Sequence, residues 1–315
     1  MMRLRGGKIV YKKIYLVNFG MQGCWYGHRV EARGVSIAVV TTDKTQTRLR
    51  LIRDSPQFLV KRLNSIHKGT KSEDLATMSV KLHEWVAVDF DYRRKEFFVL
   101  DRKNSSLLVV KDQNGLTNKI QLLYQGLSPK VKAIAYDWLR RSLYWGDPAY
   151  RSIFRLDIGH LCVDKSCENY LSWEPREKTR RLYPRSGSPK RGVLTSIIGE
   201  DVVYPTSVAV DAINARLYWA DDATLASIQS SDLDGKDRIL VVGGLVHPSG
   251  IALDYSENTQ PNLYIPRLIF WTDLDEMEPR VERSDLDGYN RVVILRGNIF
   301  YERPHALTID YDRDV

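Results

Sequence analysis

Short apolar runs separated by polar turns recur along the chain, and one copy shows the pattern most clearly. Residues 205–211 form a first run that starts at a proline and ends in an aspartate. Residues 217–221 read Leu-Tyr-Trp-Ala-Asp, which is apolar on both faces, and residues 228–231 form a third run. An Asp-Gly pair then gives a strong hairpin signal before the fourth run at 238–242. This pattern predicts four short antiparallel strands.

The four runs recur together with a ten-residue step between two aspartates, at the ends of the first and second strands. The step, stretched in its last copy, joins these pairs: Asp91 and Asp101, Asp137 and Asp147, Asp211 and Asp221, Asp254 and Asp273. Aromatic residues precede the second aspartate in the last three pairs: Tyr144 and Trp145, Tyr218 and Trp219, Phe270 and Trp271. Four-stranded units of about 45 residues, which cannot bury their own apolar faces, are the blades of a β-propeller.

The repeat also assigns a structural role to its aspartates. We expect the Leu-Tyr-Trp segment to pack one blade against the next. A carboxylate at a strand end is an acceptor suited to backbone N–H groups. Because these aspartates recur in every copy, and a catalytic residue is needed only once, we interpret them as structural and not as catalytic.

The repeat predicts an all-β protein with a partial propeller over residues 81–315. We count four complete four-stranded blades and the start of a fifth, which runs from Pro304 to Asp310. Residues 1–80 contain strand-like runs but no aspartate pair, so they are either a decayed blade or a segment foreign to the domain. A basic, cysteine-bearing segment at residues 161–191 is inserted in the second copy.

Charge and cysteines add little to this picture. Much of the formal charge of +8 lies in residues 176–191, which read as a solvated loop, with contact to a polyanion as the alternative. This loop lacks the interleaved aromatic residues that stack on bases, so nucleic acid is not expected as a partner. Cys162 and Cys167 are close enough to form a disulfide, or they remain separate thiols.

The sequence contains no run of about 18 apolar residues, so we expect no membrane-spanning helix within it. Its N-terminus is basic, but the apolar patch at residues 14–17 is too short for a signal peptide. The protein is therefore either intracellular, or its true start is missing from this sequence.

Three recurring motifs resemble those of the low-density lipoprotein receptor family. Residues 143–147, 217–221 and 270–273 resemble the YWTD motif of the class B repeats. Residues 248–254 and 281–288 resemble the first-strand and third-strand signatures of the same repeats. The resemblance implies a six-bladed propeller in the extracellular part of a single-pass membrane receptor, endocytic or signalling, with EGF-like modules beside it. Because the blades are too few for such a ring, we interpret the chain as a fragment or an incomplete gene product.

The resemblance further implies an extracellular protein ligand, bound on one end face by loops that join strands. The candidate residues of that face are Asp275, Glu276, Glu282, Arg303 and His305. Glu282 falls in the third-strand signature, where related propellers present charge to ligands. The alternative is that these carboxylates are solvated loop residues. A sequon at residues 104–106 predicts glycosylation of Asn104 in a surface turn.

A calcium-dependent propeller hydrolase, of the lactonase or esterase type, is the competing function. Such an enzyme needs unrepeated polar residues at inner strand ends, converging on a calcium ion. The inner-strand segments read Val-Ala-Val, Ile-Ala-Leu and Leu-Thr-Ile, with no odd polar member. We therefore expect a non-enzymatic binding module without a cofactor or metal. A basic scaffold for polyanions, based on the inserted loop, is the third hypothesis.

Overall fold

The computed structural model describes these residues: 4–5, 8–9, 13–19, 35–42, 46–54, 72–79, 83–91, 94–111, 119–158, 193–254, 268–296 and 307. Side chains are described from His83 onward. Every regular element in these ranges is a β-strand, which confirms the predicted all-β class. Within the described part of the chain, no helix is long and apolar enough to span a membrane.

Four antiparallel sheets follow one another from residue 85 onward, and each has four strands paired in chain order. Blade one contains β7 (Trp85–Asp91), β8 (Glu96–Asp101), β9 (Ser106–Lys111) and β10 (Lys119–Gln125). Blade two contains β11 (Ala135–Asp137), β12 (Ser142–Asp147), β13 (Ser152–Asp157) and β14 (Val193–Ile198). Blade three contains β15 (Pro205–Asp211), β16 (Arg216–Asp221), β17 (Ser227–Asp232) and β18 (Ile239–Val242). Blade four contains β19 (Pro248–Asp254), β20 (Leu268–Asp273), β21 (Arg280–Asp285) and β22 (Val292–Arg296).

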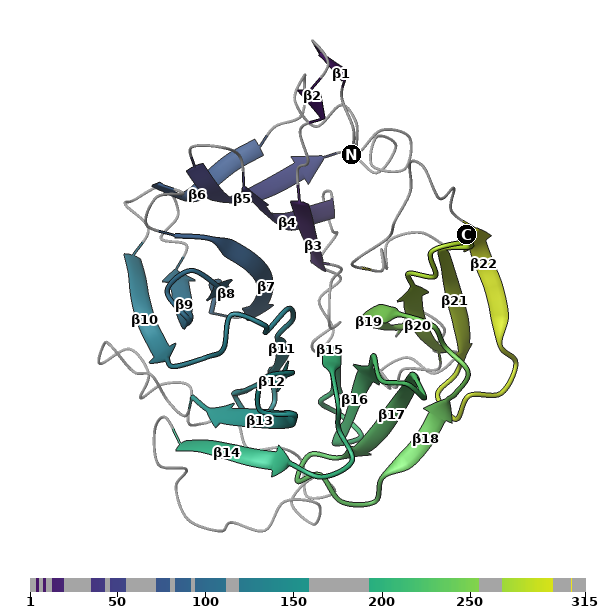
Figure 1. The fold of residues 1–315 in the computed structure, drawn as a ribbon. Helices are drawn as coiled ribbons and strands as arrows, with labels where there is room; N and C mark the ends of the chain where they lie inside the picture. The colour runs from purple at the N-terminus through teal and green to yellow at the C-terminus, as the bar shows by residue number, and fades with distance from the viewer. Residues whose placement is uncertain are drawn as a thin grey trace, which may run out of the picture.

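The blades lie around a common centre (Figure 1). The first strand of each blade is innermost and the fourth is outermost, as the labels β7 to β10 and β19 to β22 show. This arrangement is the incomplete propeller that the repeat predicts, so the predicted fold is confirmed.

The N-terminal strands form a further antiparallel sheet with the strand order of a blade. Its strands are β3 (Lys13–Phe19), β4 (Val35–Thr42), β5 (Gln46–Asp54) and β6 (Ser72–Ser79), and a pair of short strands precedes them, β1 (Leu4–Arg5) and β2 (Lys8–Ile9). Strands β3 and β4 lie beside β7 (Figure 1). The division of the chain at residue 80 stays a prediction. The predicted insertion at 161–191 and the fifth copy at 304–310 lie outside the described residues, apart from Leu307.

The two aromatic residues of the YWTD motif pack in opposite directions. Trp219 is fully buried and shares a core cluster with Tyr144 of blade two. Its neighbour Tyr218 shares a different cluster with Trp271 of blade four. Successive residues of a strand point to opposite faces of the sheet, so tryptophan meets the preceding blade and tyrosine meets the following one. The motif thus fills both interfaces of a blade from a single strand.

The hairpin between the third and fourth strands packs tightly against the preceding blade. Gly235 and Gly288 have φ angles of 81° and 90°, a region that favours glycine. A Cβ atom on Gly235 would lie 2.1 Å from the carbonyl oxygen of Ile197, and one on Gly288 would lie 1.8 Å from that of Val241. Glycine is therefore favoured at both positions for two reasons: the positive φ angle, and the lack of space for a Cβ atom.

Replacement of Trp219 by alanine tests the packing between blades two and three. Because the side chain is fully buried, we expect the substitution to lower the free energy of unfolding by about 3–5 kcal/mol, measured by urea denaturation. Tyr150→Ala is the control, since Tyr150 is 63% exposed and should change stability by less than about 0.5 kcal/mol. Equal effects of the two substitutions would contradict the packing described here.

Replacement of Gly288 by alanine tests the approach of the hairpin to β18. We expect a loss of stability of more than about 1 kcal/mol, because the new Cβ meets the Val241 carbonyl in a strained backbone conformation. Gly244→Ala is the matched control, since Gly244 has a φ of 67° but nothing within 4 Å of its Cβ position. If thermal unfolding shows the same loss of stability in both variants, the contact with the Val241 carbonyl is not the cause of the loss in Gly288→Ala.

Candidate functional site

The aspartates that end the second strands fasten the loops at one end of the propeller. Asp221 accepts hydrogen bonds from the backbone N–H groups of Val203 (3.0 Å) and Tyr204 (2.6 Å), just before β15. Asp273 accepts the N–H groups of Val246 and His247, just before β19. In blades one and two, Asp101 accepts the N–H of Glu84 and Asp147 accepts the N–H of Ser128. Each buried carboxylate thus holds the segment that enters its own blade.

The aspartates that end the first strands serve the turns at the opposite end. Asp137 accepts the backbone N–H groups of Leu139 and Arg140 at 2.9 and 3.0 Å. Asp211 accepts those of Ile213 and Asn214 in the same way. Asp254 is likewise buried at the end of β19, and Asp310 lies outside the described residues. Asp137 and Asp211 therefore act as acceptors for the backbone of the turns that follow them.

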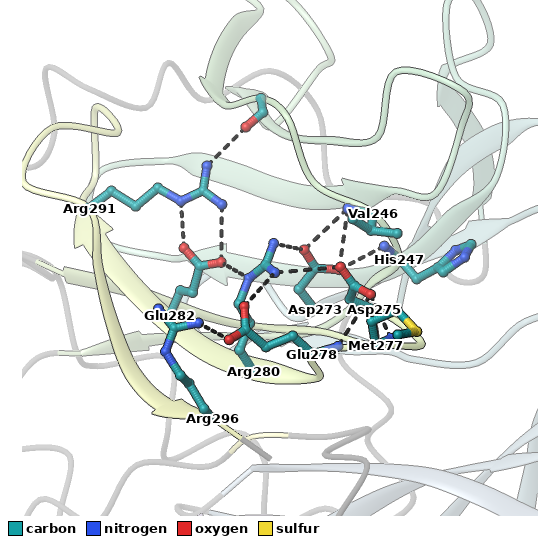
Figure 2. A network of polar contacts seen from close by, with 11 residues as sticks. Val246, His247, Asp273, Asp275, Met277, Glu278, Arg280, Glu282, Arg291 and Arg296 are labelled. Carbon is teal, nitrogen blue, oxygen red and sulfur yellow. Dashed lines mark hydrogen bonds and ion pairs between the residues drawn. The ribbon is translucent and has the colours of Figure 1, made fainter. Parts of the chain in front are cut away.

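Glu282 does not present its charge to solvent, contrary to the expectation from sequence. The residue is 1% exposed, lies opposite Trp271 in the sheet, and binds two guanidinium groups (Figure 2). Arg280 Nε donates to its Oε1 at 2.5 Å, and Arg291 Nη2 donates to the same oxygen at 3.0 Å. Burial raises the pKa of Glu282, but these hydrogen bonds outweigh burial and hold the pKa below its usual value. Glu282 therefore holds two arginines in place, and its contact with a ligand stays a prediction.

A repeated arginine, which sequence reasoning missed, ties each of two blades to the preceding one. Arg238 and Arg291 each lie three residues after the hairpin glycine. Their guanidinium groups lie over the rings of Trp219 (5.4 Å) and Trp271 (5.6 Å). Arg238 donates to the carbonyl of Glu200, and Arg291 donates to that of Gly243. The signal was present as Asp-Gly-x-x-Arg in both copies, but only the structure shows its partners.

In blades two, three and four, the loop between the second and third strands presents a large apolar side chain to solvent. Tyr150 is 63% exposed in blade two, Leu225 is 88% exposed in blade three, and Met277 is 80% exposed in blade four. Antiparallel strands place these loops at the same end as the segments that enter each blade. Val203 and Val246, which are also exposed, lie in those segments. We call these five residues the apolar band.

Hydrogen bonds connect the loops of the apolar band across blade boundaries. Arg151 Nε donates to the carbonyl of Val202 at 3.4 Å. The N–H of Leu245 donates to the carbonyl of Ala226, and His247 Nδ1 lies 3.0 Å from Asp222 Oδ1. The exposed apolar side chains therefore lie on loops that backbone and side-chain hydrogen bonds hold in place, from blade two to blade four. An ordered group of exposed large apolar side chains is typical of a protein-interaction surface.

Two predicted ligand-face residues lie at the blade-four end of this band. Asp275 and Glu276 belong to the same loop as Met277. The N–H of Met277 donates to Asp275 at 2.8 Å, and this hydrogen bond lowers the pKa of the Asp275 carboxyl. Glu276 is exposed at the tip of the loop. The structure thus brings Asp275 and Glu276 to one loop, and Arg280 links Asp275 to the buried Glu282.

The remaining predicted residues are divided between the described and undescribed parts. Asn104 is exposed in the turn between β8 and β9, and its Nδ2 donates to Asp101 at 2.9 Å. Glycosylation there stays a prediction. Five other predicted sites lie outside the described residues: Arg303, His305, Cys162, Cys167 and the loop at 176–191. Among the described side chains, no group of three or more His, Cys, Asp or Glu could hold a metal ion.

Asp89 is an unrepeated carboxylate on an inner strand, and the repeat pattern alone does not single it out. It lies opposite Phe98 in blade one, a place that alanine takes in the other three blades: Ala135, Ala209 and Ala252. Asp89 accepts the N–H of Tyr136 in β11 at 2.6 Å and its neighbour's N–H at 2.8 Å. Burial raises its pKa from 3.8 to about 7, although both hydrogen bonds oppose the shift. The residue joins the inner strands of blades one and two.

The raised pKa of Asp89 predicts a pH dependence of stability. Because the folded-state pKa is above the unfolded value, the folded chain binds this proton more tightly, and stability should fall as pH rises from about 4 to about 7. Asp89→Asn should flatten that fall, as measured by thermal unfolding across this range. Asp287→Asn, at an exposed hairpin position, is the control and should keep the slope of the parent chain. A parent-like slope in the Asp89 variant would contradict this assignment.

Comparisons with known proteins agree with this architecture. The family model described as low-density lipoprotein receptor repeat class B matches residues 215–255 and 267–311. Protein cueball of Drosophila ananassae is 26% identical over 244 residues, which cover 76% of this chain and 33% of that protein. Protein cueball of Drosophila yakuba is 27% identical over 229 residues, or 64% of this chain and 33% of that protein. The chain therefore spans about a third of the length of these curated relatives.

Solved structures share the fold at low sequence identity. The structure of the nidogen/laminin complex matches with a TM-score of 0.57 and 16% identity, over 83% of this chain and 78% of that chain. An outer coat vertex of COPII on membranes matches with a TM-score of 0.52 and 14% identity, over 91% of this chain and 66% of that one. Together with the YWTD motifs on the second strands, these matches show that the chain carries an incomplete YWTD β-propeller, whose residues 215–255 and 267–311 match the class B repeat of the low-density lipoprotein receptor.

Proposed function

We propose that this chain is a non-enzymatic, extracellular protein-binding module of a receptor like those of the low-density lipoprotein receptor family. The observation that carries the proposal is the apolar band, in which ordered loops of three blades expose Tyr150, Leu225 and Met277. Exposing side chains of this size to water is unfavourable, and three of them on loops at one end of the propeller support a surface that a partner covers.

The hydrogen-bond arrangement supports the binding role. Loops that are already ordered lose little conformational entropy when a partner docks, so more of the contact energy appears as affinity. The band combines an aromatic residue with a methionine, and both types are enriched at protein interfaces. In the nidogen/laminin complex, a propeller of this fold occurs in a protein that is bound to another protein. A polypeptide ligand is thus consistent with both the band and the fold.

Asp89 is the one observation that favours the competing hydrolase, because it is an unrepeated carboxylate on an inner strand. However, both of its oxygens accept backbone N–H groups, from Phe90 on Oδ1 and from Tyr136 on Oδ2. A calcium site needs six to eight oxygen ligands, and no cluster of acidic residues surrounds Asp89 among the described side chains. We therefore assign Asp89 to the seam between blades and favour binding over hydrolysis.

A binding screen tests the proposal. The chain would be immobilised and exposed to purified extracellular proteins, laminin among them, in biolayer interferometry. We expect a ligand whose affinity falls at least tenfold, about 1.4 kcal/mol, when Tyr150, Leu225 and Met277 are all replaced by serine. The substitutions are at the surface, so thermal stability should stay within about 0.5 kcal/mol of the parent.

The matched control is Leu122→Ser, at a 60% exposed position on the outer strand β10. It should leave binding unchanged. A ligand that loses affinity with Leu122→Ser but not with the triple variant would place the binding surface elsewhere. Hydrolysis of lactones by the purified chain in the presence of calcium would overturn the non-enzymatic assignment.

A further inference from the structure

In the loop between β20 and β21 of blade four, one carboxylate has no hydrogen-bond or ion-pair partner among the described residues. Glu276 is exposed at the loop tip next to Met277. Among the described residues, none forms a hydrogen bond or ion pair with its carboxylate, whereas every neighbouring acidic residue in the loop has a partner. Asp275 accepts the N–H groups of Met277 and Glu278, so the tip is held in a turn. The Glu276 carboxylate is thus unpaired, although it lies on a loop whose conformation is fixed by hydrogen bonds.

The ion pairs near the loop explain why no arginine pairs with Glu276. Arg280 Nη2 donates to Asp273 at 2.8 Å, and its Nη1 lies 3.7 Å from Asp275 (Figure 2). Arg296 forms an ion pair with Glu278. These two arginines therefore point at acidic groups other than Glu276, as the dashed lines in Figure 2 show. The guanidinium groups of the network hold the loop but do not neutralise its tip.

The charge around Met277 is negative, although the whole chain carries +8. The loop and its immediate partners contribute these carboxylates: Asp222, Asp273, Asp275, Glu276 and Glu278. The cations that face them are Arg280 and Arg296, and the ring of His247 lies against Asp222. At the other end of the band, the exposed cations Lys130 and Arg151 are balanced by the exposed carboxylates Glu200 and Asp201. The excess of carboxylates therefore lies at the blade-four end of the band.

From this excess of carboxylates at blade four we infer the chemistry of the partner, and the inference rests on the proposed function. We propose that the ligand is a polypeptide segment that packs aliphatic or aromatic side chains against Leu225 and Met277, and that places a lysine or arginine against Glu276. Apolar contact provides the buried area, and the free carboxylate selects the sign of the charge. A partner with an acidic residue at this position would face several carboxylates and be rejected.

The test uses random 12-residue peptides displayed on phage and selected against the immobilised chain. We expect the recovered peptides to be enriched in aliphatic or aromatic residues next to lysine or arginine. A synthetic peptide of the recovered sequence should bind at least ten times more tightly than the same peptide with glutamate in place of its basic residues. Its affinity should fall about fivefold with Glu276→Gln, and that variant should also bind with a weaker dependence on salt.

Two variants separate this inference from the proposed function. Asp287→Asn, at the opposite end of the same blade, is the charge control and should leave peptide binding unchanged. Leu225→Asp tests the surface itself. Acidic or neutral peptides whose binding Leu225→Asp abolishes would keep the band as the ligand surface but overturn the basic partner. Peptides that ignore both Glu276→Gln and Leu225→Asp, or no enrichment at all, would overturn both the inference and the surface it rests on.

Discussion

Each blade of this propeller is held by one strand whose side chains fill two interfaces at once. Trp219 packs into the cluster with blade two and Tyr218 packs into the cluster with blade four, although they are adjacent in sequence. A four-stranded sheet that is apolar on both faces is unstable alone, because neither face can be left in water. Blade-to-blade packing is therefore the constraint on which the other features depend, including the glycine hairpins and the repeated arginines.

The same packing explains why the end loops are rigid enough to form a surface. Once β16 and β20 are fixed between their neighbours, the aspartates at their ends become fixed acceptors. Asp221 and Asp273 then hold the segments that contain Val203 and Val246. These segments in turn bond to the loops of adjacent blades, as the link from Leu245 to Ala226 shows. The packing between blades thus fixes the positions of the end loops, because buried aspartates and backbone groups bond to those loops.

The charged groups divide into those that hold the fold and those that remain for a partner. Glu282 and Asp273 are buried, and their carboxylates bind arginines or backbone N–H groups. Because a buried charge is costly without a partner, these internal contacts are what allow both carboxylates to stay charged inside the fold. Exposed residues with no internal partner, such as Glu276, are the ones that can define specificity. Sequence alone does not distinguish Glu276 from Glu282, since both are glutamates near the same motif.

The amino-acid sequence by itself determined the strands, the repeat and the class of fold. The reason is that the Asp-to-Asp step, the Asp-Gly hairpins and the Leu-Tyr-Trp segments are local patterns with local causes. The acceptor role of Asp221 also follows from local chemistry at a strand end. Only the tertiary structure decided which face each side chain meets. It buried Glu282 beneath Arg291, placed Asp89 against Tyr136 of the next blade, and left Leu225 and Met277 in solvent, because these outcomes depend on neighbouring blades that lie far away in the sequence.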